Sequence, residues 1–210
     1  MIKIVDYGMG NCGSIKNMLR YLGADAQIVS QPEELIDANA IILPGVGAFD
    51  HGIKKLSAFK PILEKKILNE KVPFLGICLG MQLLLQRSEE GTLAGLGWID
   101  GEVKRFSFEL LESSRKLAVP HMGWNEVWAN SKKDNLLDPL ISGVYDRFYF
   151  VHSFHAQNVP SDNILAYCHY GYDFICAVQK NNIYGVQFHP EKSHKFGKHF
   201  LAKFIELVKC

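Results

Sequence analysis

The chain has 210 residues, 48% of them hydrophobic, with 23 basic and 22 acidic side chains and a net charge of +1. This is ordinary for a globular protein with one sizeable core, and the near-neutral balance gives no electrostatic reason to bind nucleic acid or a membrane surface. The five cysteines are odd in number and lack Cys-x-x-Cys spacing, which argues against a disulfide framework or a metal site and favours a reducing, cytoplasmic setting.

Strand-like apolar runs alternate with helical patterns in the first part of the chain. Strands are expected at Ile2–Asp6, Ala26–Val29, Ala40–Leu43 and Val72–Ile77. After the first strand, Ile15, Met18, Leu19 and Leu22 share one helix face, and Gly23 ends that helix. This order predicts a parallel sheet wrapped by helices. We expect no signal peptide before the first strand and no membrane span, since no apolar run approaches ~20 residues.

The segment Leu43-Pro44-Gly45-Val46-Gly47 follows the third strand. Its two glycines leave backbone N–H groups unobstructed toward a ligand, so it is a candidate oxyanion loop. A plain Pro-Gly turn has the same composition. The residues alone therefore leave both interpretations open.

Cys78 lies in Gly76-Ile77-Cys78-Leu79-Gly80, where a buried strand meets a run of good helix formers, Met81–Arg87. That is the arrangement of a nucleophile elbow, with sulfur in place of oxygen. The glycines let the backbone close around a strained residue, and a helix N-terminus favours the thiolate. An inert buried cysteine is the alternative, so the hypothesis needs a base elsewhere in the chain.

Short strands dominate the second half. They are expected at Gly101–Phe106, Glu126–Trp128, Phe148–His152, Leu165–Tyr170, Ala177–Lys180 and Ile183–Phe188. Val119–Glu126 is interpreted as a loop, and Lys195–Lys209 as a closing helix. Because turn residues join most of these strands, part of the sheet should be antiparallel. The predicted fold is α/β, an open mixed sheet flanked by helices, in one domain over residues 1–210.

The candidate base is His189, in Gln187-Phe188-His189-Pro190-Glu191. Proline holds the residue before it in an extended conformation, and side chains two apart on extended backbone point the same way. His189 and Glu191 should therefore face one side together. With Cys78 they have the composition of a Cys-His-Glu triad, in which the histidine takes the thiol proton and the carboxylate orients the histidine.

These motifs resemble the class I (triad) glutamine amidotransferases. Val5-Asp6-Tyr7-Gly8-Met9-Gly10-Asn11, the loop at residues 43–47 and Pro120-His121-Met122-Gly123-Trp124-Asn125 are similar, more narrowly, to the glutaminase subunits of imidazole glycerol phosphate synthases. The resemblance covers the whole chain. It implies a flavodoxin-like amidotransferase domain that hydrolyses L-glutamine to glutamate and ammonia without a metal or cofactor.

The resemblance also assigns further residues. It implies an oxyanion hole of Val46, Gly47 and Leu79, and a substrate site of Gly45, Gln82, Glu90, Ser153 and Phe154. Taken alone, Gln82 and Glu90 would be ordinary solvated residues of a helix surface. The class passes ammonia directly to a second active site, and 210 residues leave room only for the glutaminase.

A partner is therefore implied, a (β/α)8 barrel cyclase subunit in a heterodimer that forms imidazole glycerol phosphate and AICAR in L-histidine biosynthesis. Met122, Trp124, Asn125 and Lys192 are the interface residues that the resemblance implies. A core position for Trp124 and a solvated Lys192 are the alternatives for those two side chains.

Three other interpretations stay open. Cys12 and Phe154 depart from the pattern of the histidine-pathway subunits. The chain could therefore be a paralogue that supplies ammonia for an amidino group in surface-sugar synthesis. A cysteine hydrolase of the PfpI type shares the elbow, but it would carry histidine directly after the nucleophile, where this chain has Leu79. A non-catalytic interaction subunit would tolerate loss of a triad residue, and none is lost.

Overall fold

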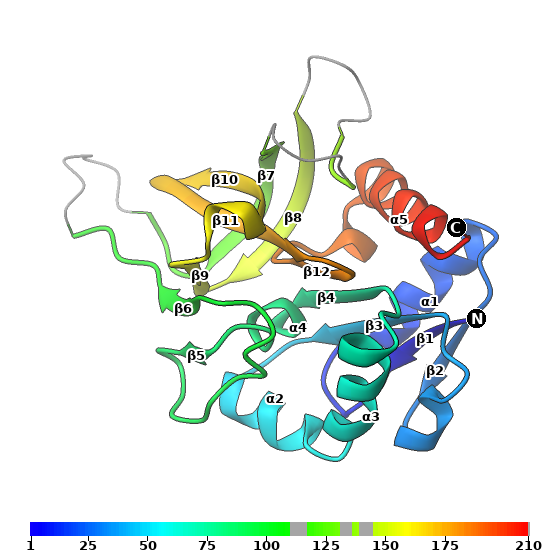
Figure 1. Cartoon of the computed structure of the whole chain (residues 1–210). Helices are drawn as coiled ribbons and strands as arrows, with labels where there is room; N and C mark the ends of the chain where they lie inside the picture. The colour runs from blue at the N-terminus through cyan, green and yellow to red at the C-terminus, as the bar shows by residue number, and fades with distance from the viewer. Residues whose placement is uncertain (110–116, 131–135, 139–144, 210) are drawn as a thin grey trace.

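A computed structural model of the chain describes residues 1–109, 117–130, 136–138 and 145–209 (Figure 1). The α-helices are α1 (Cys12–Tyr21), α2 (Phe49–Leu56), α3 (Lys60–Glu64), α4 (Leu79–Gln82) and α5 (His194–Lys209). The strands are β1 (Ile2–Val5), β2 (Ala26–Val29), β3 (Ala40–Gly45), β4 (Phe74–Cys78), β5 (Arg87–Ser88), β6 (Glu102–Arg105), β7 (His121–Ala129), β8 (Asp146–His152), β9 (Phe154–Gln157), β10 (Ile164–Tyr170), β11 (Tyr172–Lys180) and β12 (Ile183–Val186).

The main path of the sheet runs β2-β1-β3-β4-β12-β11-β10-β7-β8, and β9 connects β6 and β5 to β11. Pairing is parallel from β2 to β12 and antiparallel from β12 to β8. The predicted open mixed sheet flanked by helices is confirmed. The change from parallel to antiparallel pairing occurs beside β4, the strand that ends at Cys78.

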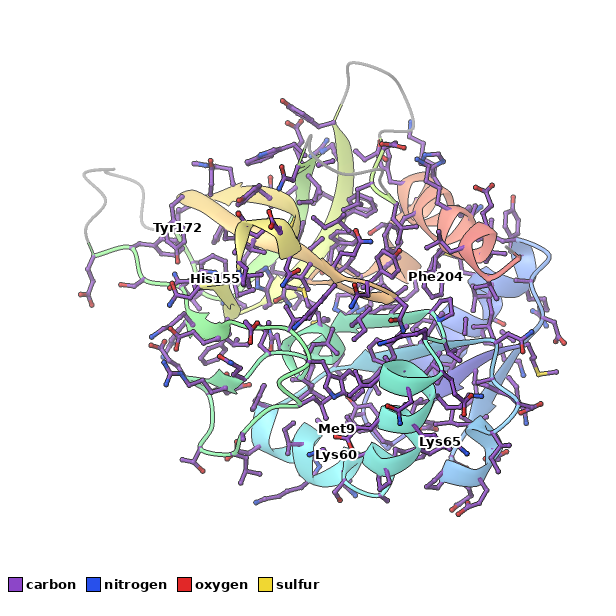
Figure 2. The ribbon with its side chains drawn as sticks, in the orientation of Figure 1. Met9, Lys60, Lys65, His155, Tyr172 and Phe204 are labelled. Carbon is purple, nitrogen blue, oxygen red and sulfur yellow. The ribbon has the colours of Figure 1, made fainter. Side chains whose placement is uncertain are left out.

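Alternating side chains of the parallel strands build a core on each face of the sheet. Ile2 and Ile4 belong to the core that contains residues of α1 and α5. Leu43 faces the opposite core, which contains residues of α2 and α3. Figure 1 shows these helix pairs on the two sides of the parallel strands, and Figure 2 labels Phe204 where α5 packs on the sheet. Among the described helices, none combines the length and apolar character needed to cross a bilayer.

The helix expected over Met81–Arg87 is wrong in length, because α4 ends at Gln82. The carbonyls that would continue it accept N–H groups from a later segment: Leu83 from Leu96, and Leu84 from Ile99. The chain is thereby drawn off the helix axis into β5. Tertiary hydrogen bonds override the helix propensity of this run.

The interpretation of Val119–Glu126 as a loop is also wrong, because most of it lies in β7. That strand pairs with β8 in an antiparallel register that aligns His121 with His152 and Trp124 with Tyr149. The second half therefore contains a longer strand than expected. Two strands that the sequence did not predict, β5 and β9, lie at the border of the site.

Candidate active site

Cys78 ends β4 with a positive φ of 55°, a conformation that only a few per cent of non-glycine residues adopt. The turn closes because glycines flank it. A Cβ on Gly76 would lie 2.6 Å from the Gly80 carbonyl oxygen, and a Cβ on Gly80 would collide with the Leu43 carbonyl. The strained backbone at a sharp strand-to-helix turn is the geometry predicted for the elbow.

His189 reaches the elbow because β12 is the parallel neighbour of β4, with Val186 opposite Ile77. His189 follows Val186 by three residues. Its imidazole Nδ1 lies 2.8 Å from Oε1 of Glu191, and both side chains are 3% exposed. The extended backbone before Pro190 places the two side chains on one side, as predicted. The structure thus brings Cys78, His189 and Glu191 together from two neighbouring strands.

The surroundings of His189 favour the protonated form of its ring. Burial lowers its pKa, but hydrogen bonding and charge interaction with Cys78 and Glu191 outweigh burial and raise the pKa to about 9. Nε2 is buried without a hydrogen bond of ordinary geometry, although it lies close enough to Cys78 to interact electrostatically with the sulfur. Because Nδ1 contacts Glu191, Nε2 is the atom available to act as general acid and base at this site.

The turn that carries His189 is tied to β8. The backbone N–H of His189 donates to the Tyr149 carbonyl at 2.9 Å, and the Tyr149 N–H donates to Oγ of Ser193 at 3.0 Å. Ser193 Oγ in turn donates to the His189 carbonyl at 2.6 Å. This fully buried serine closes a ring of hydrogen bonds that fixes the backbone of the base.

A cavity of about 520 Å³ opens beside Cys78. It is lined by Val46, Gly47, Ala48, Cys78, Leu79, Gln82, Glu90, Pro120, Val151, His152, Ser153 and Phe154. The lining includes every oxyanion and substrate residue predicted from the sequence except Gly45. That glycine lies opposite Cys78 in the register of β3 and β4, where a Cβ would meet the Tyr7 hydroxyl at 2.6 Å. Gly45 therefore permits the close approach of Tyr7 and of the start of α4 at Leu79 and Gly80.

Gln82 contacts the cavity with only part of its amide. Its Nε2 donates to the Phe154 carbonyl at 3.1 Å and to Oε1 of Gln187 at 3.0 Å. Because a carbonyl only accepts, the Gln82 amide orientation is fixed, and Gln187 must present Oε1 to Gln82. Both N–H groups of Gln82 are thus engaged, and Oε1 is the atom left for a ligand.

Gln187 is a candidate functional residue that the sequence interpretation missed. With its Oε1 turned to Gln82, its Nε2 points at Cys78 and lies 3.7 Å from Sγ, within the longer range of hydrogen bonds to sulfur. The side chain is fully buried. The available signal was the spacing, since Gln187 lies two residues before His189 on extended backbone and so faces the same side.

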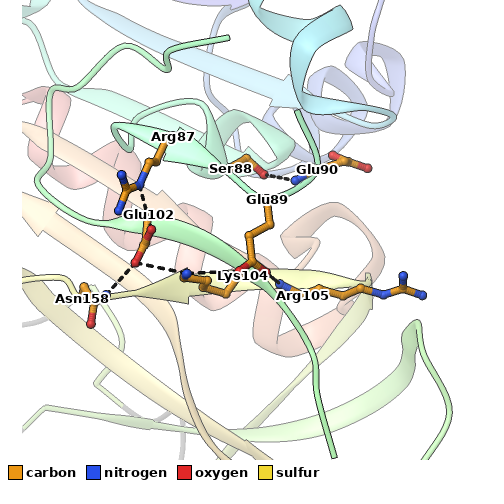
Figure 3. A network of polar contacts seen from close by, with 8 residues as sticks. All are labelled: Arg87, Ser88, Glu89, Glu90, Glu102, Lys104, Arg105 and Asn158. Carbon is orange, nitrogen blue, oxygen red and sulfur yellow. Dashed lines mark hydrogen bonds and ion pairs between the residues drawn. The ribbon is translucent and has the colours of Figure 1, made fainter. Parts of the chain in front are cut away.

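Glu90 follows β5, and its carboxylate Oε2 accepts the backbone N–H of Phe49 at 2.9 Å. Its own N–H donates to Oγ of Ser88 at 3.1 Å, and Figure 3 shows this contact beside the ion pairs of β5 and β6. In that network Arg87 and Lys104 both contact Glu102, while Lys104 also contacts Glu89. Glu90 remains directed to the cavity and to the start of α2.

The predicted interface residues lie on β7 and on the turn after His189. Met122 and Trp124 are 62% and 39% exposed and alternate with inward residues along β7. The Trp124 ring stacks on His194 with centroids 5.4 Å apart, and the Lys192 ammonium lies 5.9 Å from the centre of the Tyr149 ring. Asn125 has the opposite orientation and contacts His121 and the His169 carbonyl.

In the part of the chain that the structure describes, no group of three or more His, Cys, Asp or Glu side chains has a metal-binding arrangement. Cys12, Cys78, Cys168 and Cys176 are free thiols, while Cys210 lies outside the described residues. Burial raises the pKa of Cys12 to about 11 and that of Cys176 well above its usual range. These two thiols are therefore poor nucleophiles.

Comparison with known proteins gives full-length matches. The family model "Glutamine amidotransferase class-I" matches residues 3–207. The chain is 51% identical to the imidazole glycerol phosphate synthase subunit HisH 2 of Methanococcus maripaludis, over 98% of this chain and 99% of that protein. It is 42% identical to HisH 1 of the same organism, with 99% and 100% covered. It is 46% identical to HisH of Leptospira borgpetersenii, with the same coverage.

Solved structures agree on the fold. A putative GMP synthase protein from Thermoplasma acidophilum superposes with a TM-score of 0.72 at 23% identity, covering 99% of this chain and 93% of that one. PurLQS from Thermotoga maritima has a TM-score of 0.72 at 19% identity, with 99% and 98% covered. At these identities the likeness supports the architecture alone.

Proposed function

The chain belongs to the class I glutamine amidotransferases, and from that membership we propose that it is the glutaminase subunit of an imidazole glycerol phosphate synthase. It hydrolyses L-glutamine and delivers the ammonia for L-histidine biosynthesis. The observation that supports the proposal is the contact of His189 with both Glu191 and Cys78, where Cys78 lines a cavity large enough for an amino acid. We propose that residues 1–210 form a single glutaminase domain that acts in the cytoplasm.

The first half of the reaction forms a thioester. The Cys78 thiolate attacks the side-chain amide carbon of glutamine, and the carbonyl oxygen becomes an oxyanion. Backbone N–H groups of Leu79 and of Val46 or Gly47 stabilise it, a role worth roughly 3 to 4 kcal/mol per donor in other enzymes. The C–N bond then breaks as His189 Nε2 donates its proton to the departing nitrogen, which leaves as ammonia.

The second half releases glutamate. Neutral His189 accepts a proton from water, the water oxygen attacks the thioester carbon, and the C–S bond breaks to restore the thiolate. Glu191 supports the imidazolium that forms in this step. Glu90 and the segment Ser153–Phe154 are proposed to hold the amino acid head group, with the Gln82 Oε1 beside them.

Ammonia released into water near neutral pH is protonated and lost as a nucleophile, so the proposal includes a partner that consumes it. We propose a (β/α)8 barrel cyclase subunit in a heterodimer. Exposed Met122 and Trp124, together with Lys192, form its docking surface, and Asn125 supports the same strand from its inner face. Aromatic anchors of this kind carry much of the energy of protein interfaces.

One observation favours a second function. Methanococcus maripaludis has two HisH subunits, and this chain is 51% identical to HisH 2 but 42% identical to HisH 1. A second copy in one organism is free to serve another acceptor. With Cys12 and Phe154, this favours, as the second candidate, a paralogue that supplies ammonia for an amidino group of a surface sugar.

Glutamate release from glutamine tests both functions. We would assay the chain alone and with the histidine-pathway cyclase of the same organism plus its ribulosyl nucleotide substrate, with Cys78→Ala as the blank. Stimulation by cyclase and nucleotide, absent from the blank, is expected. Activity that ignores this cyclase would favour the second candidate, and release no greater than the blank under every condition would contradict the glutaminase.

The docking surface is tested by the affinity of the chain for the cyclase. Trp124→Ala should weaken binding by about tenfold or more, as expected for a central aromatic anchor. Tyr21→Ala is the matched control, because Tyr21 is an aromatic side chain that is 71% exposed on α1. Equal affinities of the two variants would exclude Trp124 from the interface.

A further inference from the structure

His121 and His152 face each other across β7 and β8, where the antiparallel register aligns them. Nδ1 of His121 lies 3.1 Å from Nε2 of His152, and the two residues are 3% and 6% exposed. His152 lies in the wall of the glutamine cavity, whereas His121 does not. The pair takes no part in the chemistry described above, and two buried polar side chains in contact with each other call for an explanation.

The surrounding groups fix which atom of each ring carries the proton. Nδ1 of His152 lies 2.7 Å from the Phe154 carbonyl, which only accepts, so His152 Nδ1 is the donor. In the neutral ring Nε2 then accepts, and His121 Nδ1 must donate to it. His121 Nε2 is left as an acceptor, and Nδ2 of Asn125 lies 3.3 Å from it.

The orientation of the Asn125 amide is fixed independently. Its Nδ2 donates to the His169 carbonyl at 2.6 Å, and its Oδ1 accepts the Glu126 N–H at 2.9 Å. The amide nitrogen therefore faces His121. The result is a directed chain of hydrogen bonds from Asn125 through His121 and His152 to the Phe154 carbonyl.

The packing keeps both rings neutral. His121 stacks between Phe150 and Tyr170, with ring centroids 4.9 and 4.1 Å away. Burial lowers the pKa of His121 to about 4 and that of His152 well below its usual range. The titratable groups that contact or interact with the pair include His155, His189 and Tyr170, and the charges of His155 and His189 lower the pKa of His152 further. A second proton on either ring would set two N–H donors against each other.

The chain of hydrogen bonds ends on a carbonyl that the cavity depends on. The Phe154 oxygen accepts from His152 and also from Gln82, so both of its lone pairs are used. The carbonyl before it, that of Ser153, accepts the Phe106 N–H at 3.0 Å. Both carbonyls of the Ser153–Phe154 segment are thus engaged by protein donors, which sets the orientation of the backbone that faces the ligand.

We propose that His152 is a positioning residue for glutamine, which holds the Phe154 carbonyl by its Nδ1–H and is itself held by His121 and Asn125. This inference rests on the proposed function, because it assigns the Ser153–Phe154 backbone to the amino acid head group. His152 contributes to substrate affinity and leaves the chemical step to Cys78 and His189.

Two substitutions separate the Nδ1 contact from the Nε2 contact. In His152→Asn the amide nitrogen can occupy the place of Nδ1 and keep the bond to Phe154, whereas in His152→Gln the amide reaches the place of Nε2 and loses it. We expect His152→Gln to raise the KM for glutamine by about tenfold with kcat changed less than about threefold, and His152→Asn to restore KM to within about threefold of the wild type. The assay uses the complex with the cyclase, and Glu206→Gln, at an exposed position on α5, is the control.

An unchanged KM in His152→Gln, or an equal KM in the two variants, would overturn the proposal. Since either variant can fail to fold, nitrogen-15 NMR of the wild-type imidazoles supplies a second test. We expect neutral Nδ1–H tautomers for His121 and His152 between about pH 6 and 8, and an Nε2–H tautomer or an imidazolium in either ring would contradict the hydrogen-bond chain. The NMR measurement does not depend on turnover. If the wild-type protein had no glutaminase activity, the proposed function would be wrong, whereas the hydrogen-bond chain would still be tested by the NMR spectra.

Discussion

His189 Nδ1 lies 2.8 Å from Glu191 Oε1, and this contact between two nearly buried side chains acts together with Cys78, against burial, to raise the pKa of the candidate base. Glu191→Gln keeps the shape but removes the negative charge. We expect the pKa of His189 to fall from about 9, and kcat for glutamine hydrolysis to fall by about 100-fold or more, because the imidazolium loses its partner and the tautomer is no longer fixed. NMR titration of His189 and steady-state kinetics measure the two effects.

A pKa for His189 and a kcat that both stay at wild-type values in Glu191→Gln would remove Glu191 from the triad. Glu206→Gln is a suitable control, since Glu206 is an exposed carboxylate on α5.

The raised pKa of His189 makes the stability of the folded protein depend on pH. The pKa of His189 is raised from 6.5 to about 9 on folding, so its contribution is complete below pH 6.5 and is lost as pH rises through about 9. Urea unfolding of the wild type should show the free energy of unfolding decreasing over this interval. In Glu191→Gln the decrease should be shallower, because less of the shift remains, and parallel curves for the two proteins would contradict this assignment.

Gln187 should act on the rate more than on substrate affinity, since its Nε2 contacts the sulfur at 3.7 Å and it does not line the cavity. Gln187→Glu keeps an acceptor for Gln82 but places a carboxylate beside Cys78. The like charge disfavours the thiolate, and we expect kcat to drop by about tenfold or more with KM little changed. Gln86→Glu, at an exposed position after α4, is the matched control.

Kinetics and the rate of Cys78 alkylation by iodoacetamide would both report the Gln187 effect. A Gln187→Glu variant that reacts and turns over like Gln86→Glu would show that the contact with sulfur is incidental.

Parts of the site were predictable because their constraints are local. The bend at Cys78 follows from a strand, two glycines and a helix start, and the shared orientation of His189 and Glu191 follows from Pro190. The spacing of Gln187 from His189 indicated only that the two side chains face the same side, because the contact of Gln187 with Cys78 depends on the long-range pairing of β12 with β4.

The errors in the fold have the same origin. The helix after Cys78 was predicted too long because its carbonyls bond to Leu96 and Ile99, more than ten residues away. β7 was predicted as a loop because Gly123 and the exposed Met122 and Trp124 obscure its alternation, and only the pairing with β8 makes it a strand. Long-range hydrogen bonds therefore decide the elements that border the cavity.

The close packing around the elbow glycines can be tested by measuring the free energy of unfolding. A Cβ at Gly80 collides with the Leu43 carbonyl, which is backbone of a buried strand and has little freedom to move. We expect Gly80→Ala to lower the free energy of unfolding by about 3 kcal/mol or more. Gly13→Ala is the control, because that helical glycine has open space around it and should gain up to about 1 kcal/mol. A Gly80→Ala protein as stable as Gly13→Ala would contradict the close approach.

Glu90 joins two parts of the site, since its carboxylate faces the cavity and accepts the N–H of Phe49 at the start of α2, three residues after Val46. Under the proposed function, Glu90→Ala removes the carboxylate that we assign to the ammonium group of glutamine. We expect KM to rise by about tenfold or more, with a smaller decrease in kcat from the loosened end of the Val46–Ala48 segment. Glu89→Ala is the matched control, because Glu89 bonds to Lys104 and Arg105 outside the cavity. If both variants keep the wild-type KM, the head group of glutamine does not depend on Glu90, and the ammonium must be held by another part of the cavity wall.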